Sequence, residues 1–191
     1  WLASGDSTRA MDIYLELAAG ELTAARRGEA MTVIGGLHGA RGDSAAARAA
    51  YQSSLEAYPR GTSGARAAWG ILQIGDEVDA EQALQSARTL DRARDPRLAL
   101  RAYGMYLDAL PQGVTPDPDA RLARARLASA FGRHEEALAE YRKLVESDDP
   151  DFELRVLDQW LRTRRRQGRG DAVRTIQGWI IGRFPESRQA V

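Results

Sequence analysis

Residues 31–59 read MTVIGGLHGARGDSAAARAAYQSSLEAYP, two amphipathic, alanine-rich stretches separated by Gly42-Asp43. Glycine readily ends a helix in a left-handed conformation, and an aspartate side chain accepts hydrogen bonds from the free N–H groups of the next helix. The Gly-Asp dipeptide recurs at positions 5–6, 75–76 and 170–171, and Gly132 lies in a similar place before another alanine-rich stretch. The sequence therefore predicts a helix–turn–helix unit that is repeated along the chain.

Seven residues of this stretch have a regular spacing: Met31, Ile34, Gly35, His38, Ala47, Tyr51 and Pro59. The spacing resembles that of the tetratricopeptide repeat (TPR), a helical hairpin of about 34 residues. In the TPR pattern, Met31 and His38 stand at a tryptophan and a tyrosine position. The resemblance implies that the two helices approach closely at Gly35 and Ala47 and that Tyr51 fills the gap one turn later. Pro59 then stops the second helix.

Other segments resemble the repeat less fully. One copy contains Gly132, Ala137, Tyr141, Leu144 and Pro150, and another contains Leu157, Trp160, Leu161, Gly168, Val173, Ile180 and Pro185. Partial copies contain Gly5, Ala10, Tyr14 and Leu17, and then Gly75, Ala80 and Leu84. Residues 92–118 depart most from the pattern, because prolines and a glycine between 111 and 118 predict a loop. This segment is interpreted as a degenerate repeat or a spacer.

Ten helices are expected, over residues 7–19, 21–38, 43–58, 62–74, 77–90, 96–110, 118–131, 134–147, 151–167 and 170–183. No segment shows the sustained alternation of a strand. The TPR resemblance implies an all-α fold, a right-handed α-solenoid of about five TPR-like hairpins with an irregular middle unit. We interpret residues 1–191 as one superhelical domain and as a fragment of a longer array. The N-terminal repeats occupy 1–91, the degenerate repeat or loop 92–118, and the C-terminal repeats 119–191.

The composition is that of a globular protein, with 43% apolar and 28% charged residues and a net charge of zero. Residues 154–191 are nevertheless basic, since nine arginines there face only Asp158, Asp171 and Glu186. The absence of cysteine excludes disulfides and thiolate metal sites. No apolar run approaches the ~20 residues that a membrane helix needs. We expect a membrane to be involved only indirectly, through the rest of the full-length chain.

The sequence contains no constellation that predicts catalysis, a cofactor or a metal. His38 and His134 are far apart, whereas a metal site needs three or four converging ligands. The paired carboxylates lie at expected caps and turns. Gly35-Gly36 is interpreted as helix packing, and the two Arg-Gly-Asp tripeptides, at 41–43 and 169–171, as turns. We therefore expect a protein that is not an enzyme.

The TPR resemblance implies that the first helix of each hairpin lines a concave groove. Its register places seven residues there: Trp69, Arg126, Arg155, Asp158, Arg162, Arg165 and Arg166. Arginine forks suit carboxylates, and an exposed tryptophan suits a binding hot spot. We expect another protein with an acidic surface or segment as the partner, or else only a solvated arginine-rich face. Nucleic acid is disfavoured, because the basic residues are confined to one end without interleaved aromatics.

Two junctions suggest a cellular setting. Residues 58–65 and 184–190 are similar to the aromatic-Pro-x-Ser-x-x-Ala junctions of bacterial envelope repeat proteins. This similarity implies a periplasmic scaffold in exopolysaccharide secretion or envelope assembly. One alternative is the helical superstructure of a larger enzyme such as a lytic transglycosylase, and another is a cytoplasmic regulator. The apolar last helix, with Ile176, Trp179, Ile180 and Ile181, is expected to be covered by further repeats, a partner or a second copy.

Overall fold

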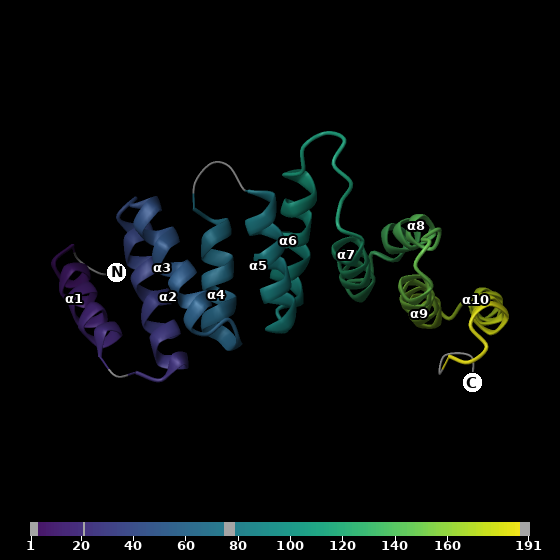
Figure 1. The fold of residues 1–191 in the computed structure, drawn as a ribbon, viewed down its shortest axis with the longest axis horizontal. Coiled ribbons are helices and arrows are strands. Elements are labelled where there is room, and N and C mark those ends of the chain that lie inside the picture. Colours follow the sequence, from purple (N-terminus) through teal and green to yellow (C-terminus); the bar gives the residue numbers. More distant parts are fainter. Residues whose placement is uncertain (1–3, 21, 75–78, 188–191) are drawn as a thin grey trace. The chain divides into compact units, whose positions relative to one another are not determined.

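The computed structural model is a succession of helices joined by turns (Figure 1). It describes residues 4–20, 22–74 and 79–187. Within them lie α1 (Ser4–Ala19), α2 (Ala24–Ala40), α3 (Ser44–Ala57), α4 (Gly61–Leu72), α5 (Ala80–Arg92), α6 (Pro96–Asp108), α7 (Pro118–Ala130), α8 (His134–Leu144), α9 (Pro150–Arg166) and α10 (Gly170–Arg183). No strand occurs in these residues, so the predicted all-α class is confirmed.

Aspartate side chains begin five of these helices. Each accepts a hydrogen bond from a backbone N–H in the first turn: Asp43 from Ala46, Asp79 from Gln82, Asp95 from Leu98, Asp117 from Ala120 and Asp149 from Phe152. These bonds satisfy N–H groups that have no partner within the helix. Three of the helices, α6, α7 and α9, also have proline in the first turn, where its missing N–H costs nothing.

The predicted Gly-Asp caps are correct at one of their four sites. Gly42 has a φ of +77° and Asp43 caps α3. The prediction is wrong at 5–6, which lie inside α1, and at 170–171, which lie in the first turn of α10. The left-handed glycine before α10 is Gly168, with a φ of +68°. The 75–76 pair lies outside the described residues, and Asp79 caps the next helix.

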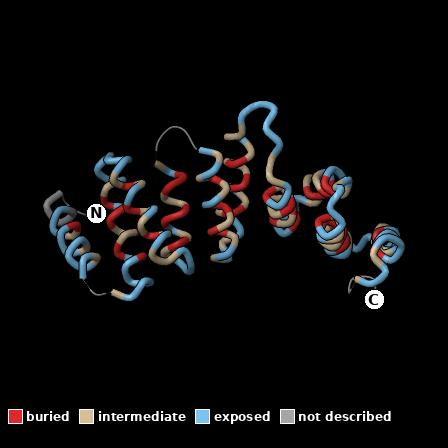
Figure 2. The backbone as a smooth tube through the Cα atoms, in the orientation of Figure 1, coloured by how far each residue is buried: buried red, intermediate tan, exposed pale blue. Residues whose placement is uncertain are grey.

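Packing divides the chain into two compact units, Trp1–Val114 (unit 1) and Thr115–Val191 (unit 2). The boundary falls inside the segment 92–118 that was predicted to be irregular. A continuous right-handed superhelix over the whole chain stays a prediction. Within each unit the buried residues lie on the helix faces that meet neighbouring helices (Figure 2).

Unit 1 is built from hairpins in which α2 packs on α3 and α4 packs on α5, while α2 and α4 lie side by side. The Tyr51 ring of α3 is held between two glycines. A Cβ added to Gly35 of α2 would lie 2.6 Å from this ring, and one added to Gly70 of α4 would lie 2.4 Å from it. Ala47 is fully buried, and Pro59 follows the end of α3. The structure thus places Gly35 beside the Tyr51 ring and buries Ala47.

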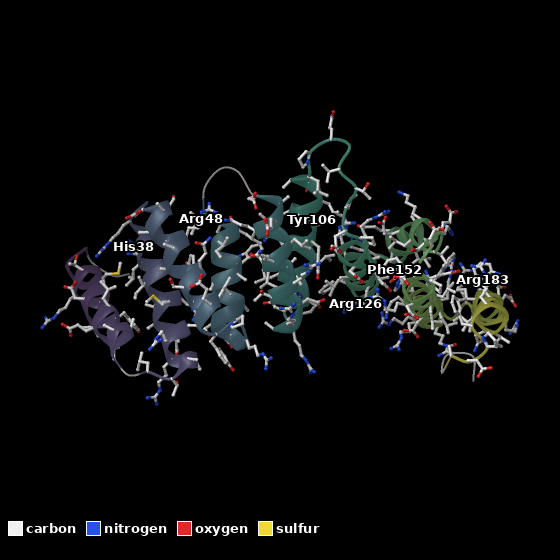
Figure 3. All side chains as sticks on the ribbon, in the orientation of Figure 1. His38, Arg48, Tyr106, Arg126, Phe152 and Arg183 are labelled. Carbon is white, nitrogen blue, oxygen red and sulfur yellow. The ribbon has the colours of Figure 1, made fainter. Side chains whose placement is uncertain are left out.

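Polar contacts tie the helices of unit 1 together. The Thr32 and Ser54 hydroxyls are 2.7 Å apart in the interior, and Ser54 donates to the Gly28 carbonyl at 2.7 Å. On α3, Arg48 (Figure 3) donates to the Ile74 carbonyl at 3.0 Å and to Gln82. Buried polar groups must be paired in this way, because an unpaired one loses its hydration without compensation.

The middle of the chain differs from the predicted repeat in the register of one helix. The buried positions of α5 include Ala83, Ala87 and Leu90, so the copy proposed at Ala80 and Leu84 is in the wrong register. The helix predicted over 96–110 is present as α6, which packs on α5 and buries residues on its inner face. The loop between α6 and α7 is therefore confined to residues 109–117.

Unit 2 consists of the hairpins α7–α8 and α9–α10. Its core joins all four helices and includes Ala137, Tyr141, Leu157, Trp160 and Ile176. The Trp160 and Trp179 rings meet edge to face, with centroids 5.7 Å apart. Gly132, with a φ of +79°, forms the turn before α8, and Pro185 follows the end of α10. These positions agree with the packing roles predicted for them.

In the part of the chain that the structure describes, none of the helices combines the length and the apolar character needed to cross a bilayer.

Candidate partner-binding surfaces

Unit 1 contains an open pocket of about 730 Å³ on the face formed by α2, α4 and the start of α6. Its lining is Thr32, Val33, Gly36 and Gly39 from α2, Ser44 and Tyr51 from α3, Thr62, Ala65, Arg66, Trp69 and Gly70 from α4, Gln73 and Ile74 after it, and Asp95 and Leu98 at the start of α6. This volume lies within the usual range for sites that bind small molecules. The pocket agrees with the predicted groove, because first helices of hairpins form most of its wall.

Trp69 forms an aromatic wall of this pocket, as its predicted groove position requires. The ring is half-buried, and the Arg101 guanidinium of α6 stacks over it, 4.7 Å from the ring centroid. A cation in this position is attracted by the electron-rich face of the indole. Trp69 is thus a partly exposed aromatic residue with a cation stacked on it.

Tyr51 of α3 and Gly36 of α2 lie close together in the lining of the pocket. An added Cβ on Gly36 would be 3.7 Å from the Tyr51 hydroxyl. Burial raises the pKa of Tyr51 above its usual value of 10.0, and the nearby positive charge of Arg66 acts in the opposite direction. The phenol is therefore a neutral hydrogen-bonding group at neutral pH, with a cation beside it.

A smaller pocket of about 260 Å³ extends this surface toward the start of α2. It shares Thr32, Val33, Thr62 and Arg66 with the larger pocket and adds Ala25, Arg26, Glu29 and Ser63. The two pockets therefore form one groove between α2 and α4, which we call the unit 1 groove. Its far end has the arginines Arg26 and Arg66 with one carboxylate, Glu29.

In unit 2, the charged residues predicted for the groove form a stripe along α9. Arg155, Arg162, Arg165 and Arg166 are exposed, and Asp158 is partly exposed between them. Their spacing of three and four residues keeps them on the side of α9 opposite Val156, Leu157 and Trp160, which are in the core. These residues are accessible to a partner, and their place in a concave groove stays a prediction.

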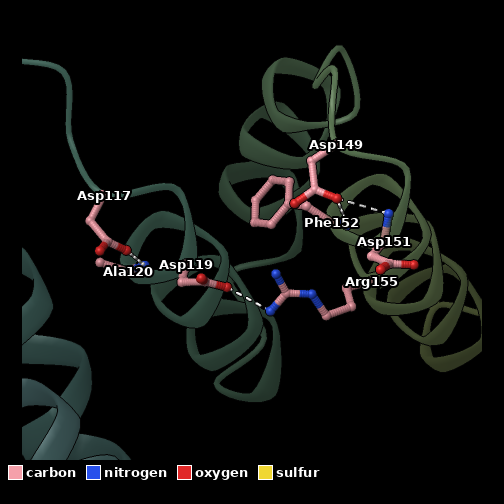
Figure 4. Close-up of polar contacts among 7 residues, drawn as sticks. All are labelled: Asp117, Asp119, Ala120, Asp149, Asp151, Phe152 and Arg155. Atoms are coloured by element: carbon pink, nitrogen blue, oxygen red, sulfur yellow. Dashed lines mark hydrogen bonds and ion pairs between the residues drawn. The ribbon is translucent and has the colours of Figure 1, made fainter.

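Two of the four arginines on the stripe are paired with carboxylates. Arg155 donates to Asp119 of α7 at 2.7 Å (Figure 4), and its guanidinium also lies 5.1 Å from the centre of the Phe152 ring. Arg162 donates to Asp158 at 2.8 Å, one helical turn away. In the described residues, neither Arg165 nor Arg166 forms an ion pair. The basic character of the stripe therefore comes from these last two residues.

Arg126 lies on α7 in the same unit (Figure 3). It is near enough to Tyr141 of α8 to influence that phenol electrostatically, as is Arg166 of α9. Burial raises the pKa of Tyr141 above 10.0, and Thr163, Arg166 and Arg126 act in the opposite direction. Arg126 of α7 and Arg166 of α9 thus both lie near Tyr141.

Other ion pairs of unit 2 join the helices and lie outside the stripe. Arg124 of α7 binds Glu136 of α8 at 2.6 Å, Arg121 binds Glu140, and Arg183 binds Glu153. Nothing in the described residues resembles a metal site, because no three His, Cys, Asp or Glu residues converge there. His38 lies 3.6 Å from Asp43 at a turn.

The predicted site residues fall into two groups. Trp69 belongs to unit 1, whereas the six charged residues belong to unit 2. Sequence reasoning missed the contributions of Arg66 and Arg101 in unit 1. It also interpreted both Gly35 and Gly36 as packing residues, which is correct for Gly35 and wrong for Gly36, because Gly36 is exposed in the pocket.

The comparisons with known proteins support the fold. No protein-family model matches the chain, and no curated protein matches it in sequence. Among solved structures, YrrB, a TPR protein with an unusual peptide-binding site, is similar with a TM-score of 0.52 and 17% identity. The match covers 98% of this chain and 97% of that one. MamA superposes less well, with a TM-score of 0.46, 13% identity, and coverage of 94% and 89%.

The likeness to YrrB concerns the fold alone, since the identity is low. It agrees with the arrangement of helical hairpins. The chain is therefore a TPR-like protein in its architecture: an all-α array of helical hairpins.

Proposed function

We propose that this chain is a non-catalytic scaffold that binds a segment of another protein in the unit 1 groove. The observation that carries the proposal is the pocket of about 730 Å³ between α2, α4 and α6, with Trp69 in its wall. YrrB, which has a similar fold, is described as having a peptide-binding site, and this supports the same use of the fold here.

The dimensions of the groove suit a short extended peptide. Its lining on α2 extends from Ala25 to Gly39, which at a rise of 1.5 Å per residue corresponds to roughly 20 Å. An extended chain advances about 3.3 Å per residue, so about six residues would fill this length. A binding segment of that size offers enough contacts for specificity without requiring a folded partner domain.

The stripe on α9 is proposed as a second contact, for an acidic part of the same or another partner. Arg165 and Arg166 are exposed and can each offer two parallel N–H donors to a carboxylate. Arg126 adds positive charge on the neighbouring helix α7. Ion pairs between these arginines and carboxylates of a partner would contribute more to the association rate and specificity than to affinity.

A displayed library of random peptides, selected against the chain, tests the groove. We expect enriched peptides to lose binding to the Trp69→Ala variant, because a buried aromatic anchor commonly accounts for tenfold or more in affinity. Trp179→Ala is the control, since Trp179 is an exposed tryptophan of α10 in unit 2. Peptides that bind both variants and the parent equally would refute a role for the unit 1 groove.

For the cellular role, we propose a periplasmic scaffold in exopolysaccharide secretion or envelope assembly. The junction at 184–190 supports it by sequence similarity. In the structure, Phe184 of this junction packs on the core of unit 2, so a structural role would also account for that residue. Fractionation of cells that express the full-length protein tests the compartment. Recovery in the cytoplasm would favour the regulator instead.

The alternative is the helical superstructure of a larger enzyme such as a lytic transglycosylase. The exposed apolar residues Trp179 and Ile181 of α10 favour some covering surface, either the rest of such a chain or a second copy. Light scattering of the purified chain over a concentration series tests whether the covering surface is a second copy. A monomer at all concentrations would argue against self-association through α10.

A further inference from the structure

We propose that the unit 1 groove selects an acidic segment that inserts one large apolar side chain between Trp69 and the bare backbone of α2 at Gly36 and Gly39. The inference rests on the function proposed above and names the class of ligand. It is carried by the shape of the pocket, by the difference between its glycines, and by the charges on its rim.

The glycines around the pocket are of two kinds. Gly35 and Gly70 are required for packing, because an added Cβ on either would lie within 2.6 Å of the Tyr51 ring. Gly36 and Gly39 are not, because the nearest atoms to an added Cβ are 3.7 and 3.9 Å away, which is ordinary contact. Neither has a positive φ. Alanine would fit at both positions and would favour the helix more than glycine does.

Because Gly36 and Gly39 line the cavity, the absence of side chains at these positions enlarges it. Both line the pocket, and a side chain at either would fill part of the space opposite Trp69. Other helical glycines with open surroundings, such as Gly104 and Gly178, do not line it. The bare stretch of α2 thus keeps a hollow open where a ligand can approach the helix backbone closely.

The hollow has the chemistry of an apolar side-chain pocket. Trp69, Val33, Ala65, Ile74 and Leu98 supply apolar surface around it, and the Arg101 guanidinium stacks on the Trp69 ring. An aromatic or large aliphatic side chain that entered would replace water against this surface. The Tyr51 hydroxyl and polar groups on the rim would then orient the peptide backbone.

The charges around the hollow favour an acidic segment. Arg66 lines both parts of the groove, Arg26 lies at its far end, and Arg101 covers Trp69. The lining has two carboxylates, Asp95, which also caps α6, and Glu29, so three arginines face two negative charges. Acidic residues on either side of the inserted side chain would therefore find more positive than negative charge.

Two fluorescent seven-residue peptide pools test this inference by anisotropy with the whole chain. Both have phenylalanine, tryptophan or leucine at the centre, and the flanking positions are acidic in one pool and basic in the other. We expect the acidic pool to bind about tenfold more tightly, since charge reversal replaces attraction by repulsion at exposed arginines. A third pool, acidic with alanine at the centre, should bind about tenfold more weakly than the acidic parent pool.

Gly36→Leu provides the matched variant, because it fills the hollow at a helical position with free space. Gly178→Leu is its control in α10, where an added Cβ meets nothing within 4 Å. We expect about a tenfold loss of acidic-pool binding for the first and none for the second. Arg66→Glu should shift the preference toward the basic pool, and it is informative even if Gly36→Leu fails to fold.

The outcomes separate the two proposals. Equal binding of the acidic and basic pools, or unchanged binding by folded Gly36→Leu, would overturn the ligand class. If library peptides still depend on Trp69 in that case, the scaffold function stands and only this inference fails. If no peptide of any pool or library depends on Trp69, both proposals fail.

Discussion

Replacing Gly35 and Gly36 separately with alanine should change the stability of unit 1 in opposite directions. The two residues are neighbours in α2 and look equivalent in the sequence. The structure distinguishes them, because an added Cβ would lie 2.6 Å from the Tyr51 ring at Gly35 and 3.7 Å from the Tyr51 hydroxyl at Gly36. The ring cannot retreat from Gly35, because Gly70 holds its other face.

The magnitudes follow from two effects. Alanine in a helix interior is more favourable than glycine by about 1 kcal/mol, and this applies to both positions. Overpacking of a filled core costs about 1–3 kcal/mol, and this applies at Gly35 alone. Gly36→Ala should therefore gain up to about 1 kcal/mol, and Gly35→Ala, where the two effects oppose each other, should lose up to about 2 kcal/mol. The propensity gain is common to both variants, so their difference equals the overpacking cost of about 1–3 kcal/mol, which corresponds to roughly 3–10 °C in melting temperature.

Urea and thermal unfolding followed by far-UV circular dichroism measure the difference. The cause is tested by repeating Gly35→Ala in a Tyr51→Ala background, where the clash is absent and the same substitution should cost much less. If the two single variants have equal stability, or if the cost of Gly35→Ala is the same without the Tyr51 ring, the assigned role of Tyr51 packing is wrong.

Three further predictions concern unit 2 and the tyrosines. The buried hydroxyls of Ser129 and Thr163 are 2.8 Å apart, so Thr163→Val should cost about 1–3 kcal/mol by leaving Ser129 poorly paired, and adding Ser129→Ala should recover part of that loss in urea unfolding. Burial raises the pKa of Tyr141, so the contribution of its neutral form to the free energy of unfolding should be fully present below about pH 10 and should be lost as the pH rises above it. Tyr141→Phe should remove part of this loss of stability at high pH, and a pH profile of stability that is unchanged in Tyr141→Phe would contradict the prediction. Reversal of Arg165 and Arg166 to glutamate should weaken binding of an acidic partner several-fold with unchanged helicity, and unchanged affinity would exclude the stripe as a contact.

Helix positions were predictable because their determinants are local. Asp43, for example, caps α3 by accepting a hydrogen bond from the N–H of Ala46, three positions later, and Pro59 follows the end of the same helix. The register of α5 was not predictable in the same way. Gly75-Asp76 has the sequence of the expected cap, but the helix begins after Asp79, which accepts a hydrogen bond from the Gln82 N–H. Two acidic residues at similar distances from an alanine-rich stretch give the same local pattern.

The candidate sites depended on contacts between distant segments, and there the sequence was less informative. The stripe of α9 was assigned from the register that the TPR resemblance implies. Its partial neutralisation could not be assigned in this way, because Asp119 is 36 positions before its partner Arg155. The unit 1 groove was predicted through Trp69 alone. Gly36 could be distinguished from Gly35 only once the position of the Tyr51 ring was known.

The packing of each helix mainly on the next one, and on the next but one, has a consequence for how the chain acquires its structure. Contacts between residues close in sequence require little loop closure, and proteins rich in them fold quickly. A hairpin such as α2–α3 contains most of its own partners, so it can form as soon as both helices have left the ribosome. Unit 1 can therefore fold during synthesis, before the residues of unit 2 have been translated.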